Sequence, residues 1–340
     1  MTSIPLISIL TPVYNRAKLI GETADSIFNQ NYQNWEWVIV DDGSTDGSWD
    51  VLQRIADRDK RVRVFQRHRE PKGACTCRNI AADKSLGEYL LFLDSDDLLA
   101  PFCLQQRVWA TQEAPNHDFI IFPMLLFRKQ LDDMMLLWNI DKEEDDLLRV
   151  LTGDAICQTS GPLWRRNAFF EIGMWNEELM LWQDVELHIR SFLHPVKYKK
   201  RLDLLPDVYL RVSDDSLSRV GYHAPQKLMS RIEVFRYALE EIANKGKLEQ
   251  YKQGLRAMGA DVLISAVNGK LFNEAEKLMR FTEKHRIFSK QELGKINYYT
   301  LAYKTRLYKI PMLFRLFSRS VENIASSADI SIGTVEWQRT

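Results

Sequence analysis

Aspartates gather directly after two apolar stretches of the sequence. There are five of them: Asp41, Asp42, Asp94, Asp96 and Asp97. They follow the apolar runs at residues 37–40 and 89–93. Carboxylates that share one crevice repel one another unless a cation, or a ligand rich in hydrogen-bond donors, compensates their charge. Carboxylate oxygens are also the ligands that hard divalent ions prefer. These residues therefore predict a binding site for a cation or a donor-rich ligand.

Short buried strands and amphipathic helices alternate over the first hundred residues. Strands are predicted at residues 7–10, 37–40, 62–65 and 89–93. Apolar stripes at helical spacing lie between them, at residues 19–28, 51–55 and 74–84. This order predicts an α/β fold with a mostly parallel sheet and helices on its faces. Ligands bind outside the carboxyl ends of such strands, where the aspartates lie. No G-x-G-x-x-G fingerprint occurs, which argues against a dinucleotide-binding fold.

The composition is that of an ordinary globular protein. Apolar residues make up 45% and charged residues 27% of the 340 residues, which excludes a disordered or fibrous chain. The 46 basic and 46 acidic residues balance, so no nucleic-acid partner is expected. The sequence shows neither a run of about 18 apolar residues nor the pattern of a signal peptide. The four cysteines match no zinc spacing and are expected to be reduced thiols, so we expect a cytoplasmic protein.

The second half of the chain is expected to become increasingly helical. Further strands are predicted at residues 117–127, 158–166 and 208–212. Helices are predicted at residues 167–171, from about 183, from about 225, and around 248–267 and 272–285. The acidic run 141–146 is expected to be a solvated loop or the start of a helix.

Residues 293–321 combine basic and aromatic side chains and contain no acidic residue. Such a segment suits the surface of an anionic membrane. It equally suits a helix that packs its aromatic rings on the core and leaves its cations in water. Both interpretations stay open at the level of sequence.

Four stretches of the sequence resemble motifs of the family 2 glycosyltransferases. They are residues 7–15 (ISILTPVYN), 35–46 (WEWVIVDDGSTD), 78–97 (with GEYLLFLDSDD at its end) and 183–190 (QDVELHIR). The likeness covers residues 5 to about 220 and implies the GT-A fold, a Rossmann-like sheet flanked by helices. It implies a GT-A domain over residues 1–223, in which 1–110 bind a nucleotide sugar and 111–223 bind the acceptor. Residues 224–340 would form a helical C-terminal region outside the likeness.

The resemblance implies a donor site in the first part of the chain. Three residues would line the nucleoside pocket: Thr11, Pro12 and Tyr14, the last close to the base. Asp42 would accept a hydrogen bond from the base, which favours the imide N–H of uracil and therefore a UDP-sugar. Asp41 could instead cap the turn that follows it. Arg78 would contact the nucleotide or its phosphates, or form a salt bridge with a nearby aspartate.

Asp94-Ser95-Asp96 occupies the position of the family's metal motif. Asp94 would touch the ribose or the metal, Asp96 would bind the metal directly, and Ser95 would belong to the donor site. Mn²⁺ or Mg²⁺ held there would neutralise the charge that develops on a nucleoside diphosphate leaving group. Asp97 is expected to be a local cap. Relatives often carry a histidine where this chain has Ser213, so the third metal ligand stays open between His223 and Asp214.

Asp184 is the residue that the resemblance implies as general base. Transfer with inversion needs a carboxylate to take the proton of the acceptor hydroxyl as it attacks C1 of the sugar. Asp184 is expected at a helix N-terminus, where the dipole favours the ionised form, although it could merely cap that helix. Gln183 stands where many relatives have glutamate. Trp164 and Trp182 could stack on a sugar of the acceptor or belong to the core.

The sequence therefore predicts an inverting glycosyltransferase. It would move a sugar from a nucleotide sugar, with UDP favoured, to a hydroxyl of a glycan or lipid-linked glycan. Residues 293–321 could give peripheral contact at the inner face of a membrane. A phosphotransferase would need Thr or Val where Leu98 stands, and a nucleotidyltransferase would need a Gly-rich basic loop near the N-terminus. A non-catalytic nucleotide-binding scaffold stays open as an alternative.

Overall fold

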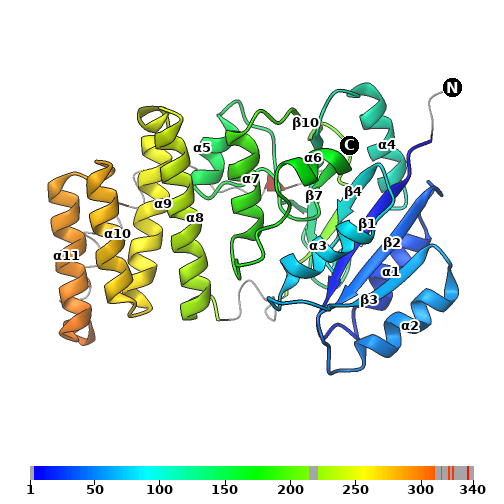
Figure 1. The fold of residues 1–340 in the computed structure, drawn as a ribbon, viewed down its shortest axis with the longest axis horizontal. Helices are drawn as coiled ribbons and strands as arrows, with labels where there is room; N and C mark the ends of the chain where they lie inside the picture. The colour runs from blue at the N-terminus through cyan, green and yellow to red at the C-terminus, as the bar shows by residue number, and fades with distance from the viewer. Residues whose placement is uncertain are drawn as a thin grey trace.

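A sheet of seven strands forms the centre of the N-terminal part of the molecule (Figure 1). The computed structural model describes residues 4–213 and 221–310, together with 315, 321, 324, 335 and 336. The strand order is β10-β6-β9-β4-β1-β2-β3. The strands are β1 (Ile7–Val13), β2 (Trp35–Asp41), β3 (Val62–Gln66), β4 (Tyr89–Phe92), β6 (Phe119–Ile121), β9 (Pro162–Arg165) and β10 (Tyr198–Lys200). β9 runs antiparallel to β4 and β6, and the other neighbouring pairs are parallel, which confirms the mostly parallel sheet.

Helices connect and cover these strands, although the sequence pattern did not indicate α4. They are α1 (Ile20–Phe28), α2 (Ser48–Arg58), α3 (Ala74–Lys84), α4 (Cys103–Glu113), α5 (Asp146–Leu151), α6 (Arg166–Glu171) and α7 (Gln183–Leu193). The chain enters β4 through Gly87, where a Cβ atom would lie 2.5 Å from the Ser8 hydroxyl oxygen. Glycine therefore allows this turn to lie directly against β1. The four cysteines are buried free thiols.

The strand predicted at residues 117–127 is two strands in different sheets. β6 ends before Pro123, and β7 (Met124–Phe127) joins a second sheet of order β12-β8-β7-β11-β5. Proline lacks the N–H that a continuous central strand would need, which explains the break. The other members of the second sheet are β5 (Leu98–Leu99), β8 (Leu136–Leu137), β11 (Val208–Arg211) and β12 (Val335–Glu336). The prediction of one continuous strand is therefore wrong.

A row of long helices extends away from the sheet (Figure 1). It consists of α8 (Pro225–Asn244), α9 (Leu248–Asn268), α10 (Phe272–Lys284) and α11 (Lys290–Lys304), followed by the 3₁₀ turn η1 (Leu307–Lys309). Within the described residues, no helix combines the length and hydropathy needed to cross a bilayer. One apolar cluster joins α5 and α7 to these helices and includes Leu151, Ile189, Phe235 and Leu263. The boundary expected at residue 223 stays a prediction, and a common core spans it.

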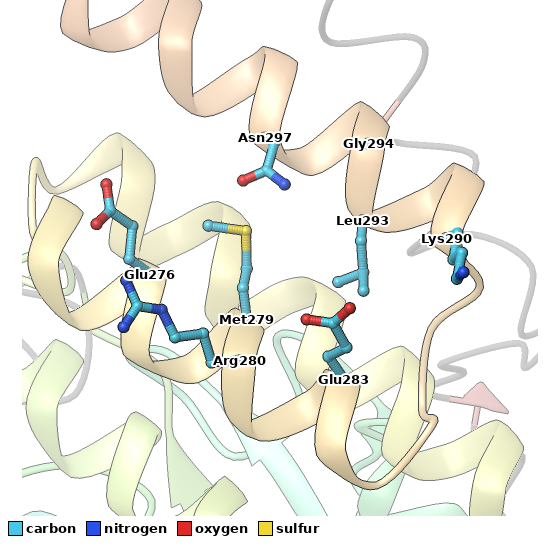
Figure 2. Close-up of a pocket in the computed structure, with 8 residues that line it drawn as sticks. All are labelled: Glu276, Met279, Arg280, Glu283, Lys290, Leu293, Gly294 and Asn297. Atoms are coloured by element: carbon cyan, nitrogen blue, oxygen red, sulfur yellow. The ribbon is translucent and has the colours of Figure 1, made fainter.

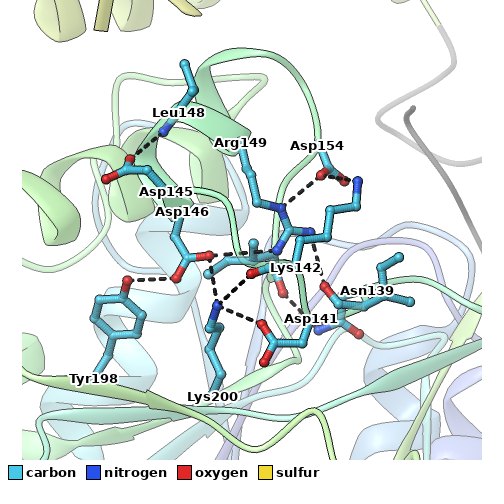
Figure 3. Close-up of polar contacts among 12 residues, drawn as sticks. Asn139, Asp141, Lys142, Asp145, Asp146, Leu148, Arg149, Asp154, Tyr198 and Lys200 are labelled. Carbon is cyan, nitrogen blue, oxygen red and sulfur yellow. Dashed lines mark hydrogen bonds and ion pairs between the residues drawn. The ribbon is translucent and has the colours of Figure 1, made fainter. Parts of the chain in front are cut away.

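A buried ionic network fixes α5 against the sheet (Figure 3). Arg149 is fully buried and donates from Nε to Asp154 at 2.9 Å. Lys200 of β10 donates to Asp146 at 3.2 Å. Asp145 caps the helix, because its carboxylate accepts the Leu148 N–H at 2.9 Å. The acidic run is therefore the start of a helix, and its last residue is buried among cations rather than solvated.

Candidate active site

The loops that follow β1, β2 and β4 meet at one edge of the large sheet. The Asn15 N–H after β1 donates to the Ser44 hydroxyl after β2 at 2.9 Å. Arg16 lies 3.6 Å from a carboxylate oxygen of Asp96, which follows β4. Carboxyl ends of parallel strands share an edge, so these contacts confirm that the structure gathers the predicted aspartates there.

The loop after β4 presents two carboxylates and hides the residues next to them. Asp94 and Asp96 are partly exposed, whereas Ser95 and Asp97 are buried. Arg78 donates to Asp94 at 2.6 Å. Burial and the charge of Asp94 raise the pKa of Asp96, although the nearby Arg16 opposes this shift. Two partly exposed carboxylates under mutual repulsion are suited to receive a cation.

Asp97 is a structural anchor, which corrects the expectation of a local cap. Its carboxylate accepts the Arg211 N–H of β11 at 3.0 Å and the Ser160 hydroxyl at 3.1 Å. Burial and the charges of Asp96 and Asp94 raise the pKa of Asp97 well above its ordinary value. Arg211 also donates from Nε to the main-chain oxygen of Asp96 at 2.9 Å. Strand β11 thereby fixes the shape of the loop that carries the two exposed carboxylates.

The two carboxylates of this loop suit a divalent ion whose remaining ligands come from the substrate and water. No group of three or more His, Cys, Asp or Glu side chains with metal-binding geometry occurs in the described part of the chain. Mg²⁺-type ions are commonly bound through one or two carboxylates, with phosphate oxygens and water completing the shell. Asp94 and Asp96 match that arrangement. Of the expected third ligands, His223 is exposed and Asp214 lies outside the described residues.

Arg78 links the carboxylate loop to the helix that carries the predicted base. It is buried in α3, and it donates to Asp94 at 2.6 Å and to the side-chain oxygen of Gln183 at 3.1 Å. The salt bridge that the sequence left as an alternative is therefore present. The Gln183 amide also donates to the Leu179 main-chain oxygen at 2.8 Å, so protein groups hold it at both ends.

Asp184 lies in the first turn of α7, beside this arginine. Trp182 occupies the N-cap position with a left-handed φ of 60°, so Asp184 is not the cap itself. Burial raises the pKa of Asp184, the charge of Arg78 opposes that shift, and the charge of Asp94 adds to it. Since both charges act on it, the predicted base shares one electrostatic environment with the metal-motif aspartate. A raised pKa makes the carboxylate a better proton acceptor.

The strand residues expected in the nucleoside pocket have buried side chains. The Thr11 hydroxyl accepts a hydrogen bond from the Trp37 indole at 2.9 Å, and both residues are fully buried. Pro12 is also buried. β4 pairs with β1 only as far as Leu10, so the main chain beyond that residue diverges from β4. Thr11 can therefore serve a ligand through its main chain rather than through its hydroxyl.

Two cations from the loop after β3 lie beside residues that the sequence analysis expects at the nucleoside. Arg67 donates to Asp42 at 2.6 Å, and the Lys72 ammonium lies 3.8 Å from the centre of the half-buried Tyr14 ring. The Asp41 carboxylate accepts the N–H groups of residues 43 and 44, both at 3.0 Å, so it does cap its turn. The sequence interpretation missed Arg67, Lys72 and Arg16. Their signal was position, because all three follow the carboxyl end of a parallel strand.

The expected acceptor tryptophans differ in their surroundings. Trp164 is 1% exposed and its ring stacks on Phe119 at a centroid distance of 4.2 Å, so the prediction that it contacts a sugar is wrong. Its strand β9 lies inside the sheet, which buries both faces. Trp182 is partly buried, packs on the helical core, and lies 4.8 Å from the Arg231 guanidinium.

A separate hollow of about 450 Å³ opens between α10 and α11 (Figure 2). Residues of both helices line it, among them Arg280, Glu283, Lys290 and Asn297. None of the predicted catalytic or donor-site residues lines it. The predicted site residues therefore lie apart from this hollow.

Residues 8–173 match the model of a family described as glycosyl transferase family 2. This part of the chain belongs to that family. An uncharacterized glycosyltransferase of Haemophilus influenzae is 42% identical over 106 residues, 31% of this chain and 42% of that protein. The putative teichuronic acid biosynthesis glycosyltransferase TuaG of Bacillus subtilis is 44% identical over 93 residues, 27% of this chain and 36% of that protein. These matches span less than half of either relative's length.

Solved structures share the fold of this chain across nearly its whole length. Staphylococcus aureus TarS 1–349 in complex with UDP superposes with a TM-score of 0.65 at 20% identity, covering 95% of this chain and 91% of TarS 1–349. The mannosyltransferase PcManGT of Pyrobaculum calidifontis, solved with GDP-Man and Mn²⁺, gives a TM-score of 0.53 at 17% identity, covering 95% and 87%. This likeness confirms the GT-A fold, helical C-terminal region included.

Proposed function

We propose that this protein is an inverting glycosyltransferase that uses a UDP-sugar and a hydroxyl of a glycan or lipid-linked glycan. The observation that carries the proposal is the bridge made by Arg78. It joins Asp94 at 2.6 Å to Gln183 at 3.1 Å, and Asp184 follows Gln183 directly. Asp94, proposed to act at the leaving group, and Asp184, proposed to accept the proton, therefore lie on either side of the Arg78 guanidinium.

The choice of nucleotide and acceptor is supported by relatives and by the contacts of Asp42. TarS has been solved with UDP and with UDP-GlcNAc. TuaG is named for teichuronic acid biosynthesis. WcaA of Escherichia coli, which is 37% identical over 121 residues, is named for colanic acid biosynthesis. Both names favour a polysaccharide acceptor. In this chain Arg67 holds one oxygen of Asp42, and the other oxygen is an acceptor that suits the N3–H of uracil.

The proposed reaction is a single displacement at C1 of the donor sugar. Asp184 takes the proton of the acceptor hydroxyl, whose oxygen forms a bond to C1 while the bond from C1 to the phosphate oxygen breaks. The bonding electrons leave with the nucleoside diphosphate, and attack from the opposite side inverts C1. Arg78 orients the Asp94 carboxylate and offers its N–H groups to the departing diphosphate. A divalent ion held by Asp94 and Asp96 would supply further neutralisation of that charge.

Titration calorimetry with UDP, GDP and CMP, each with and without Mn²⁺, tests the donor site. We expect UDP to bind only with Mn²⁺, and Asp96→Ala to abolish that binding. Asp25→Ala, which removes an exposed carboxylate on α1, is the matched control and should bind as the wild type does. Failure of all three nucleotides to bind would overturn the donor assignment.

Ser213 keeps the non-catalytic scaffold as a second candidate, because a hydroxyl replaces a side chain that could ligate the metal. Measuring the release of UDP from UDP-sugars distinguishes the scaffold from the glycosyltransferase. A scaffold would bind UDP yet release none from any UDP-sugar, and Asp184→Asn would change nothing measurable. Contact with a membrane is a separate proposal, since it depends on the C-terminal helices rather than on the sheet edge.

A further inference from the structure

Exposed apolar side chains concentrate at the end of the helical row. Four large apolar residues are exposed within one 13-residue stretch: Tyr298 (58%), Leu301 (53%), Leu307 (38%) and Ile310 (47%). The other exposed large apolar residues of the described chain are spread over residues 4–205. The stretch belongs to α11 and η1, and α11 is the outermost helix of the row (Figure 1). Single exposed apolar residues need no explanation, whereas a cluster of them marks an interaction surface.

Helix α11 packs on the core through the side that lies opposite Leu301. The helix already buries Leu293, Ile296 and Ala302 in the apolar core. Tyr298 and Leu301 lie on the opposite side, in the exposed row that Gly294 begins and that repeats every three or four residues. The helix is therefore amphipathic toward the core and carries a second apolar stripe on its outer face.

The turn after α11 extends that outer face. The rings of Tyr303 and Tyr308 stack at a centroid distance of 4.6 Å, which holds η1 against the end of the helix. Leu307 and Ile310, on either side of Tyr308, are exposed. We name the surface formed by Tyr298, Leu301, Leu307 and Ile310 the outer apolar face.

Cations surround the outer apolar face. Residues 290–310 contain five basic residues and one acidic residue, a net charge of +4 in a chain whose total is zero. The acidic residue, Glu292, pairs with Arg256 on α9. Four of the cations form no salt bridge with any described residue: Lys290, Lys295, Arg306 and Lys309. An apolar stripe bordered by cations complements a surface that has anionic groups on its exterior and an apolar layer directly below them.

We propose that the outer apolar face binds the surface of an anionic lipid bilayer, with Leu301 and its apolar neighbours in the interface and the cations at the headgroups. Amphipathic helices bind membranes by this combination of apolar burial and attraction to anionic lipid. A second copy of the chain is the less favourable occupant, because a two-fold contact would place +4 against +4. The proposal does not depend on the reaction at the sheet edge.

Co-sedimentation of the full chain with lipid vesicles tests the proposal. The probes are vesicles of phosphatidylcholine with phosphatidylglycerol, and vesicles of phosphatidylcholine alone. We expect binding to the first and none to the second. Arg306→Gln combined with Lys309→Gln should weaken binding roughly 25-fold, at about fivefold for each cation near an anionic surface. Leu301→Ser should weaken it about tenfold, through lost apolar burial.

Matched variants elsewhere on the molecule control for altered exposure and charge. Leu205 is 53% exposed, as Leu301 is, so Leu205→Ser removes an equally exposed leucine. Arg54→Gln with Lys60→Gln removes one arginine and one lysine from the exposed side of the sheet region. Both controls should bind vesicles as the wild type does.

Two results would overturn the proposal. One is no binding of the wild type to anionic vesicles, and the other is equal weakening by the control variants. Sedimentation velocity adds a separate outcome: a wild-type dimer that Leu301→Ser dissociates, without vesicle binding, would assign the face to a second copy instead. UDP binding should be the same in all variants. If the wild type does not bind UDP, that result would count against the proposed function and not against the proposed membrane-binding surface.

Discussion

The buried pair Arg107–Asp207 offers a strong test of how the site is supported. Arg107 of α4 donates to the two Asp207 carboxylate oxygens at 2.9 and 2.8 Å, and both side chains are 0% exposed. Arg107 also donates to the Ser160 main-chain oxygen at 3.3 Å. Asp207→Asn keeps the shape of the side chain but leaves the guanidinium buried without a counter-charge.

Breaking a buried pair by changing one partner costs about 3–5 kcal/mol. Asparagine keeps one acceptor oxygen, so we expect the lower end, about 3 kcal/mol. With an unfolding entropy of about 2.1 cal/mol/K per residue, a chain of 340 residues has roughly 0.7 kcal/mol/K in total. The expected fall in Tm is therefore about 4 °C, measured by calorimetry or circular dichroism.

Asp203→Asn is the matched control for this substitution. Asp203 also pairs with an arginine, Arg201, but its side chain is 64% exposed. Exposed pairs contribute about 0–1 kcal/mol, so the control should lower Tm by about 1 °C or less. Equal Tm values for the two variants would refute the reasoning. Since Ser160 donates to Asp97, Asp207→Asn should also weaken Mn²⁺-dependent UDP binding, whereas the control should not.

Three further outcomes concern the chemistry at the sheet edge. Asp184→Asn should lower kcat by about 10²–10⁴-fold and leave UDP affinity unchanged in calorimetry, because a general base acts only in the chemical step. Because burial raises the pKa of Asp184, the rate should begin to fall at a higher pH than an exposed aspartate would give, as the carboxylate protonates. His188 cannot cause that fall, since burial lowers its pKa to about 3. Arg78→Met should move the fall in rate to still higher pH, whereas Arg78→Lys should not, and pH–rate profiles of both variants check this. Asp42→Asn should reduce the preference for UDP over CMP in competition titrations, because an amide can also donate to the base.

The alternating elements of the first hundred residues could be predicted because local pattern and tertiary environment agree there. Helix α4 was missed, since Arg107 and Thr111 occupy its buried side and disguise the apolar stripe. The sequence left Trp164 open between a sugar contact and the core, because its burial depends on β9 being inserted between β4 and β6. Contacts between chain segments that lie far apart in sequence produce no local hydrophobic periodicity, so the sequence pattern cannot predict them.

The carboxylate loop shows the same division. The alternation that aims Asp94 and Asp96 outward is a local property of extended chain and was predictable. The anchoring of Asp97 depends on Arg211, which lies 114 positions further along the sequence. The role of Gln183 in holding Arg78 likewise depends on how α7 packs against α3.

The apolar cluster shared by α7 and the C-terminal helices has a consequence for how the protein unfolds. Helix α8 packs on α7 in a shared apolar cluster that includes Ile189, Leu193 and Phe235. Thermal unfolding should therefore proceed as one cooperative transition rather than as separate meltings of sheet and helices. Amide hydrogens of α7 should exchange with solvent at the rate set by the C-terminal helices. A chain shortened at residue 223 would retain the strands of the proposed donor site and lose the packing that supports Asp184, the proposed base.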